Sequence, residues 1–187
     1  FFMEGVSEQH ITGMAAGLAM EGFIPYFNTI ATFITRRNFE QNVIDLGLHK
    51  VPVRLIGNGG GLVYAPLGPT HQAIEDISIM RTIPNMHIIA PCDSIEMKEL
   101  ITQTVKIKNP MYIRLAKGGD EIVTTKKKIK YGKSLLFGSS KNILFVSTGV
   151  MTQECIKEIW LSNARRKEHF FHIPFEEAEL VKLRDTA

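Results

Sequence analysis

The chain has 187 residues, 44% of them hydrophobic, which is enough apolar material for one or two folded domains. Its formal net charge is +3 and its densest basic run, Lys126 to Lys128, lies in a polar stretch, so the charge does not indicate nucleic acid as a partner. No apolar run approaches the roughly 18 residues of a membrane span. The two cysteines are far apart in the sequence and predict neither a disulfide framework nor a metal site. We therefore expect a cytoplasmic protein.

Helical and strand-like segments alternate along the first 120 residues. Apolar spacing and turn residues predict helices over residues 11–21, 32–48, 72–81 and 93–107, and strands over 25–29, 51–56, 86–90 and 111–115. Asp93 and Glu96 resemble a capping box at the start of the last helix. This alternation predicts an α/β fold, with a mostly parallel sheet and helices on both faces.

The remainder of the chain predicts a linker and part of a second domain. Residues 121–133 are polar and lysine-rich, as expected for a linker. Within 134–187, strands are predicted over 142–147 and 170–173 and a helix over 152–160, which is too little for a complete α/β domain. The first residues, Phe1 to Met3, read as the middle of a strand, so we expect that the N-terminal part of the first domain is missing.

Glu8 stands in the most informative motif, Gly-Val-Ser-Glu-Gln-His, directly before a helix rich in small residues. In an α/β sheet, ligands bind at the edge where strands end and helices begin. The alternative is that Glu8 only complements the positive end of the helix dipole. The residues alone leave both interpretations open.

Three further segments fall near the ends of predicted strands: residues 32–36, the glycine loop 57–61, and Gly-Pro-Thr-His at 68–71. With the Glu8 motif, these segments resemble the pyrimidine-binding domain of thiamine diphosphate enzymes. The matching pieces are Gly-Val-Ser-Glu-Gln-His, Gly-Pro-Thr-His-Gln and Arg-Thr-Ile-Pro-Asn-Met-His-Ile-Ile-Ala-Pro-Cys-Asp. The resemblance is to the transketolase and 1-deoxyxylulose-5-phosphate synthase branch. It covers residues 1–120 well, and residues 131–187 more weakly resemble the start of the transketolase C-terminal domain.

The resemblance implies catalytic and cofactor-binding roles for three residues. Glu8 matches the glutamate that hydrogen-bonds N1′ of the aminopyrimidine and thereby activates the cofactor. Phe33, which is 25 positions after Glu8, matches the aromatic residue that stacks on this ring. His71 matches a histidine near the reacting carbonyl of the substrate. The alternatives are a core role for Phe33 and a structural role for His71.

Two basic residues match substrate-binding positions of the family. An arginine at the position of Arg36 faces the substrate in the synthase branch, and Lys117 stands where relatives commonly use arginine to bind a phosphate. Arg114 is the neighbouring alternative to Lys117, and both Arg36 and Lys117 could instead be solvated surface charges. The chain departs from the family at Leu67, where relatives have an aspartate that contacts substrate hydroxyls, and at Asn58, directly before Gly59-Gly60-Gly61, where relatives place a histidine or arginine. An altered substrate preference is the expectation.

The diphosphate-binding signature of the family, Gly-Asp-Gly with a downstream asparagine, does not occur in the sequence. The resemblance therefore implies that thiamine diphosphate and its Mg²⁺ or Ca²⁺ are held with a pyrophosphate-binding domain or subunit, in a homodimer or heterotetramer. The expected activity is transfer of a two-carbon ketol unit between sugars or sugar phosphates. Synthase-type condensation of pyruvate with an aldehyde and a catalytically silent regulatory role are alternatives. The Gly-Pro-Thr-His motif argues against the beta subunit of a 2-oxo acid dehydrogenase.

Overall fold

The computed structural model describes residues 1–125, 127–138, 144–163 and 169–172. The chain divides into two compact units, which are described separately below. Unit 1 comprises residues 1–89 and 105–117, and unit 2 comprises residues 90–104 and 118–187. The domain boundaries expected from the sequence, at residues 120 and 133, stay predictions.

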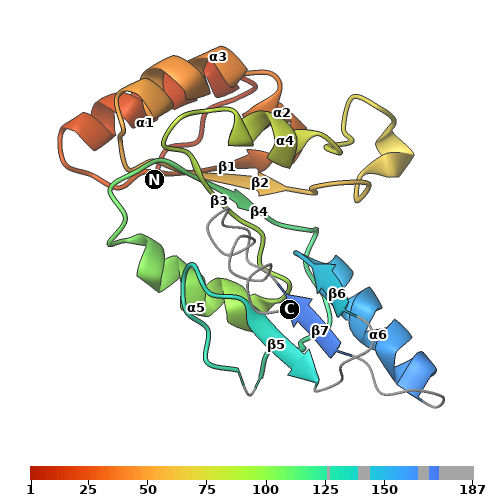
Figure 1. The fold of residues 1–187 in the computed structure, drawn as a ribbon. Helices are drawn as coiled ribbons and strands as arrows, with labels where there is room; N and C mark the ends of the chain where they lie inside the picture. The colour runs from red at the N-terminus through yellow and green to blue at the C-terminus, as the bar shows by residue number, and fades with distance from the viewer. Residues whose placement is uncertain (126, 139–143, 164–168, 173–187) are drawn as a thin grey trace. The chain divides into compact units, whose positions relative to one another are not determined.

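Unit 1 is built on a four-stranded parallel sheet (Figure 1), which confirms the predicted α/β class. Its strands are β1 (Tyr26–Ile30), β2 (Arg54–Asn58), β3 (His87–Ile89) and β4 (Met111–Arg114), in the spatial order β1-β2-β4-β3. Ile30 pairs with Asn58, and Gly57 pairs with Arg114, so these three strands end at one edge of the sheet. The loops that follow them are therefore brought together, as ligand-binding loops are in other parallel sheets.

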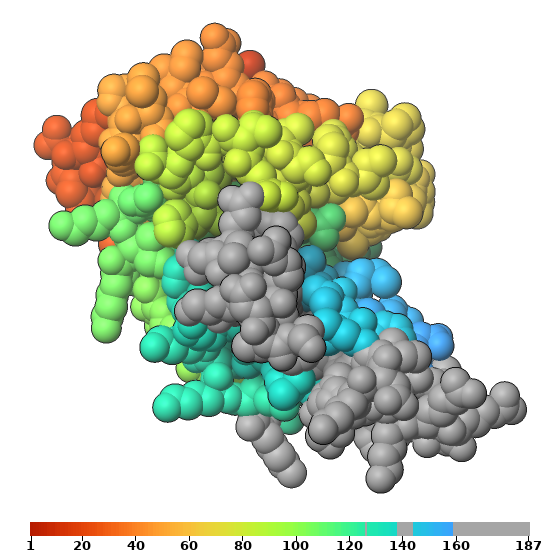
Figure 2. All heavy atoms as spheres, in the orientation of Figure 1, coloured from red at the N-terminus to blue at the C-terminus, as the bar shows by residue number. Residues whose placement is uncertain are grey.

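The helices of unit 1 follow its strands or precede the first of them. They are α1 (Glu8–Met20), α2 (Ala31–Thr35), α3 (Phe39–Gln41) and α4 (Asp76–Arg81), with a short 3₁₀ turn at Ala65–Leu67. Figure 1 shows all four α-helices on the same side of the sheet. Their apolar side chains join those of the strands in one core, in which Ile34, Leu55 and Met80 are fully buried. The segment between β2 and α4, yellow in Figures 1 and 2, lies at the edge of unit 1.

The single helix predicted over residues 32–48 is wrong. The chain forms α2, a turn at 36–38, α3 and then a π-helix, η1 (Asn42–Leu48). Two buried amides explain the interruption, because side-chain amides compete for backbone hydrogen bonds. Asn42 Nδ2 donates to the carbonyl oxygen of Ile34 at 2.8 Å, and the Asn38 amide lies 2.6 Å from the Thr12 hydroxyl. The turn places two arginines next to α2.

The described residues of unit 2 form a three-stranded mixed sheet and two helices. The strands are β5 (Leu135–Gly138), β6 (Leu144–Ser147) and β7 (His169–His172), and the helices are α5 (Ser94–Thr104) and α6 (Met151–Asn163). β7 lies between β5, to which it is antiparallel, and β6, to which it is parallel. Strand β5 was not predicted from the sequence, and residues 173–187 of the predicted partial domain lie outside the described part.

The predicted capping box at the start of α5 is confirmed. Asp93 Oδ1 accepts from the backbone N–H of Glu96 at 2.8 Å, and Glu96 Oε2 in turn accepts from the backbone N–H of Cys92 at 2.7 Å.

Across the described residues, no helix is long and apolar enough to cross a lipid bilayer.

Candidate active site

Glu8 is the first residue of α1, and its carboxylate is buried although it is charged. The side chain is only 7% exposed. Burial of an ionised carboxylate is costly unless the charge is paired, and the pairing group here is the guanidinium of Arg37, with Nη1 2.8 Å from Oε2. Both interpretations made from the sequence, a binding role and a dipole role, are compatible with this position.

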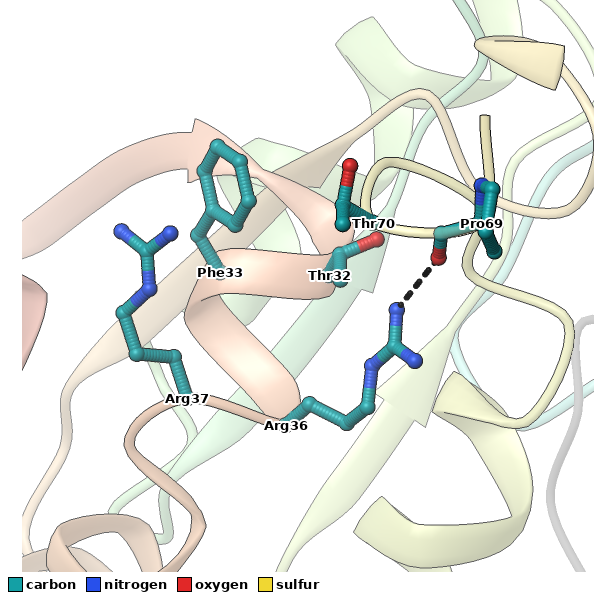
Figure 3. A pocket seen from close by; sticks show the side chains of 6 residues that line it. All are labelled: Thr32, Phe33, Arg36, Arg37, Pro69 and Thr70. Carbon is teal, nitrogen blue, oxygen red and sulfur yellow. Dashed lines mark hydrogen bonds between the residues drawn. The ribbon is translucent and has the colours of Figure 1, made fainter. Parts of the chain in front are cut away.

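Phe33 lies in α2, which begins directly after β1 at the carboxyl edge of the sheet. Its ring faces an open pocket of about 520 Å³, within the range typical of small-molecule sites. Figure 3 shows the side chains that line this pocket: Thr32, Phe33, Arg36, Arg37, Pro69 and Thr70. Phe33 is half-buried, so it is not the fully enclosed core residue of the alternative interpretation.

His71 meets the same aromatic ring from the loop before α4. The ring centroids of Phe33 and His71 are 5.2 Å apart and the planes are inclined by 68°, which is an edge-to-face contact. The Thr70 hydroxyl lies 2.9 Å from Nδ1 of His71 and restrains the orientation of the imidazole. Two residues predicted from separate motifs are thus in direct contact.

Arg37 is the site residue that the sequence analysis missed. Besides its ion pair with Glu8, its Cζ lies 4.0 Å from the centroid of the Phe33 ring, in a cation–π contact. Arg37 therefore links the predicted cofactor-activating residue to the predicted stacking residue. The one available signal was the Arg-Arg pair at 36–37 after Phe33, and spacing alone does not say which of the two turns toward Glu8.

Arg36 lines the same pocket, but its guanidinium extends away from that of Arg37 (Figure 3). Its Nε pairs with Glu75 Oε1 at 2.9 Å, while Nη2 donates to the carbonyl oxygens of Pro69 and Gln72 at 3.2 and 3.0 Å. These contacts fasten α2 to the loop that carries His71. A substrate role for Arg36 stays a prediction.

Lys117 is exposed three residues after the end of β4, and it does not line the pocket beside Phe33. Leu67 is also exposed, at the end of the 3₁₀ turn. Neither the phosphate-binding role of Lys117 nor the effect of Leu67 on substrate preference is tested by these positions.

A buried polar cluster packs against the glycine loop that follows β2. Asp76 Oδ2 accepts from the Tyr112 hydroxyl and from Arg114 Nε, both at 2.7 Å. Burial, and then the neighbouring Asp76 carboxylate, raise the pKa of Tyr112, so the phenol stays protonated and donates. The Arg114 side chain fills the space beside Gly60, and a Cβ on Gly60 would overlap it. The loop therefore needs glycine at this point.

The residues fit one part of the expected cofactor. A buried carboxylate and a half-buried aromatic ring beside an open pocket provide a hydrogen-bonding group and a stacking surface for a flat heterocycle. Within residues 1–125, 127–138, 144–163 and 169–172, no group of three or more His, Cys, Asp and Glu side chains could hold a metal ion. The expected Mg²⁺ or Ca²⁺ in a partner domain is not tested by this finding.

The fold and the pocket define a class of protein: a parallel α/β domain with an aromatic ring in a pocket after its first strand, and a buried acid joined to that ring through an arginine. The family model described as "Transketolase, pyrimidine binding domain" matches residues 1–119. The chain belongs to this thiamine diphosphate-dependent, transketolase-like family, which confirms the resemblance inferred from its motifs.

Curated relatives include several 1-deoxy-D-xylulose-5-phosphate synthases. The enzyme of Dictyoglomus turgidum is 36% identical over 160 residues, covering 84% of this chain and 26% of that protein. The enzyme of Clostridium perfringens is 39% identical over 158 residues, covering 83% of this chain and 25% of the relative. The chain thus spans about a quarter of the length of these synthases.

Solved structures share the fold. A structure described as "Split gene transketolase, inactive beta4 tetramer" has a TM-score of 0.83 at 28% identity, covering 93% of this chain and 57% of that one. The transketolase of Campylobacter jejuni has a TM-score of 0.79 at 20% identity, covering 93% of this chain and 29% of that one, a likeness of fold alone.

Proposed function

We propose that this chain forms the pyrimidine-binding part of a thiamine diphosphate-dependent enzyme, in which the Glu8 carboxyl group hydrogen-bonds the aminopyrimidine of the cofactor. The single observation that carries the proposal is the buried Glu8 carboxylate, which Arg37 joins to the face of Phe33 beside the pocket. A surface acid that merely offset a helix dipole would not need to be buried. The family match over residues 1–119 supports the same assignment.

The edge-to-face contact between Phe33 and His71 supports their proposed parts. Phe33 offers a flat apolar face for the aminopyrimidine, and His71, held by Thr70 and packed on Phe33, offers a hydrogen bond to a substrate oxygen. Arg36 and Lys117 are proposed to bind the substrate, Lys117 as a point charge for a phosphate. When bound, the cofactor supplies the nucleophile and the electron sink.

The reaction that we favour is transfer of a two-carbon ketol unit between sugars or sugar phosphates. The likeness to the split-gene transketolase supports it, because that structure covers nearly all of this chain at 28% identity. The exposed Leu67, in place of the family aspartate, favours a substrate other than those of housekeeping transketolases.

Condensation of pyruvate with an aldehyde is a second candidate, which the 36–39% identity to 1-deoxy-D-xylulose-5-phosphate synthases favours. A silent, regulatory relative is a third candidate. The split-gene transketolase neighbour is an inactive beta4 tetramer, which is consistent with a subunit that has no activity by itself. The intact pair of Glu8 and Phe33 argues against a silent role.

A pyrophosphate-binding domain or subunit is part of the proposal. The chain covers 25–26% of the synthases cited above and 57% of the split-gene neighbour, and an additional polypeptide region would supply the diphosphate and metal site. We propose that Mg²⁺ or Ca²⁺ is held there, in a homodimer or a heterotetramer.

The experiment that tests this function measures thiamine diphosphate binding to the chain with and without a candidate pyrophosphate-binding partner, in the presence of Mg²⁺. We expect binding only in the assembled protein. Assays of ketose donors against pyruvate consumption then separate the two reactions. Absence of binding with every partner would contradict the enzymatic proposal and favour the silent role.

A further inference from the structure

Arg37 contacts both side chains that the proposed function assigns to the aminopyrimidine. Its Nη1 donates to Glu8 Oε2 at 2.8 Å, and its Cζ lies 4.0 Å from the centroid of the Phe33 ring. A guanidinium is planar and charged, so it combines a charge-assisted hydrogen bond with stacking on an aromatic face. An aminopyrimidine would use the same carboxyl group and a ring face in a similar way. The two groups therefore have the same binding partners.

The backbone of Arg37 is held in place, whereas its side chain is partly exposed. Arg37 lies in the turn between α2 and α3, where Gln9 Nε2 donates to its carbonyl oxygen at 3.2 Å and the adjacent Asn38 is fully buried. The Arg37 side chain is 39% exposed, whereas that of Glu8 is 7% exposed. Rotation of one half-exposed side chain toward solvent would uncover the carboxylate.

Arg36 shows that an arginine in this turn need not cover Glu8. Arg36 is held by the carboxylate of Glu75 and by two backbone carbonyl oxygens, all on the loop and helix that carry His71. Arg37 instead has one carboxylate partner and one aromatic face, and both belong to the proposed cofactor site. Adjacent arginines thus serve different sets of contacts.

We infer that Arg37 competes with thiamine diphosphate for Glu8 and Phe33 and thereby sets the affinity of the site for its cofactor; this inference rests on the proposed function. With Arg37 inward, the buried carboxylate is neutralised and the ring face is covered. Cofactor binding exchanges the guanidinium for the aminopyrimidine, and the lost ion pair and cation–π contact reduce the net affinity.

The test titrates thiamine diphosphate, with Mg²⁺, into the protein assembled with its pyrophosphate-binding region. Arg37→Ala should tighten the dissociation constant about tenfold, because a part-buried ion pair and a cation–π contact no longer oppose binding. Arg37→Lys should give an intermediate value, since lysine keeps the charge but loses the planar stack. Arg81→Ala, which removes an exposed arginine at the end of α4, is the matched control and should leave the constant unchanged.

Thermal stability gives a second readout that is independent of activity. Without cofactor, Arg37→Ala should lower the melting temperature, because the buried Glu8 carboxylate loses its counterion. At saturating cofactor the difference from the wild type should narrow, since the ion pair is then absent from both proteins. A difference that stays constant at all cofactor concentrations would overturn the inference.

A double variant tests whether the effect passes through Glu8. In a Glu8→Gln background, Arg37→Ala should give a smaller gain in affinity than in the wild type. An equal gain in both backgrounds would overturn the competition for Glu8. If Arg37→Ala does not fold, Arg37→Gln removes the charge with a smaller change in shape and should also tighten binding.

The outcomes separate the inference from the proposed function. If the wild type binds the cofactor and Arg37→Ala binds it equally or more weakly, the inference is wrong and the proposed function stands. Binding by Arg37→Ala but not by the wild type would support the inference strongly. If neither protein binds with the partner region present, both the inference and the proposed function are wrong.

Discussion

The imidazole of His71 packs edge-to-face on the ring of Phe33, with the centroids 5.2 Å apart. The two residues are 38 positions apart in the chain and come from different sequence motifs. The contact places a hydrogen-bonding ring beside the surface proposed to receive the aminopyrimidine. In the proposed function, Phe33 stacks on the cofactor and His71 acts on the substrate.

His71→Ala should lower kcat by about 100-fold, as expected when a positioned acid–base or hydrogen-bonding group is removed. The dissociation constant for thiamine diphosphate should change little, because Phe33 and Glu8 stay in place. Steady-state kinetics and a cofactor titration of the assembled enzyme measure the two effects. An unchanged kcat at saturating cofactor would mean that His71 only supports the ring of Phe33.

Phe33→Leu should weaken cofactor binding by several-fold, since aromatic stacking contributes about 0.5–1.5 kcal/mol beyond the burial of area. Phe39→Leu is the matched control, because Phe39 is partly buried against the core and does not line the pocket. The control should lower the melting temperature without changing the dissociation constant. Equal cofactor affinity of Phe33→Leu and the wild type would contradict stacking.

Asp93→Asn should reduce stability at neutral pH by about 1.5–3 kcal/mol, the range for hydrogen bonds to a charged group. Burial by itself would raise the pKa of Asp93, but hydrogen bonds from the backbone of Glu96, Val123 and Thr124 and from the Thr124 hydroxyl outweigh it and lower the pKa. A lowered pKa in the folded state stabilises the fold above the unfolded pKa, and this stabilisation is lost as the pH falls through the folded value.

The difference in stability between the wild type and Asp93→Asn should therefore reach its maximum at pH 6–7. It should shrink below roughly pH 4, near the ordinary pKa of aspartate. Melting temperatures across this pH series provide the measurement. Glu99→Gln, an exposed carboxylate on the same helix, should show almost no difference at any pH. A difference for Asp93→Asn that grows as the pH falls would contradict the assignment.

Gly57→Ala should destabilise unit 1. A Cβ at Gly57 would lie 2.7 Å from the ring and the hydroxyl of Tyr112 and 3.1 Å from Cα of Ala31, so either the buried phenol or the start of α2 must shift. Gly17→Ala is the control, because the added methyl group meets nothing within 4 Å and alanine favours a helix by about 1 kcal/mol over glycine. Chemical denaturation should show a lower free energy of unfolding for Gly57→Ala and a higher one for Gly17→Ala. Equal stability of Gly57→Ala and the wild type would contradict the packing argument.

The sequence predicts the parallel sheet of unit 1 well. Short apolar strands that are bounded by glycine or proline and alternate with segments of helical apolar spacing form a strong local pattern. It does not predict the interruption of the helix after α2, which depends on the buried amides of Asn38 and Asn42 finding backbone and side-chain partners. Strand β5 was missed because it is a four-residue segment beside a lysine-rich stretch, and its pairing with β7 is made by residues more than 30 positions away.

Glu8, Phe33 and His71 could be proposed from motifs, since each stands in a recognisable local pattern. Arg37 could not, because its role depends on a tertiary contact across 29 positions to Glu8. Two adjacent arginines look equivalent in a sequence, and only the turn at 36–38 directs one toward Glu8 and the other toward Glu75. The substrate roles of Arg36 and Lys117 stay predictions for the same reason.

The most direct test of the central claim measures exchange of the C2 proton of bound thiamine diphosphate with deuterium, in the assembled enzyme and in its Glu8→Gln variant at saturating cofactor. If the Glu8 carboxyl group activates the aminopyrimidine, exchange in the variant should be slower by about 100-fold or more, the usual effect of removing a group that participates in proton transfer. Exchange as fast as in the wild type, with cofactor bound to both proteins, would contradict the role of Glu8.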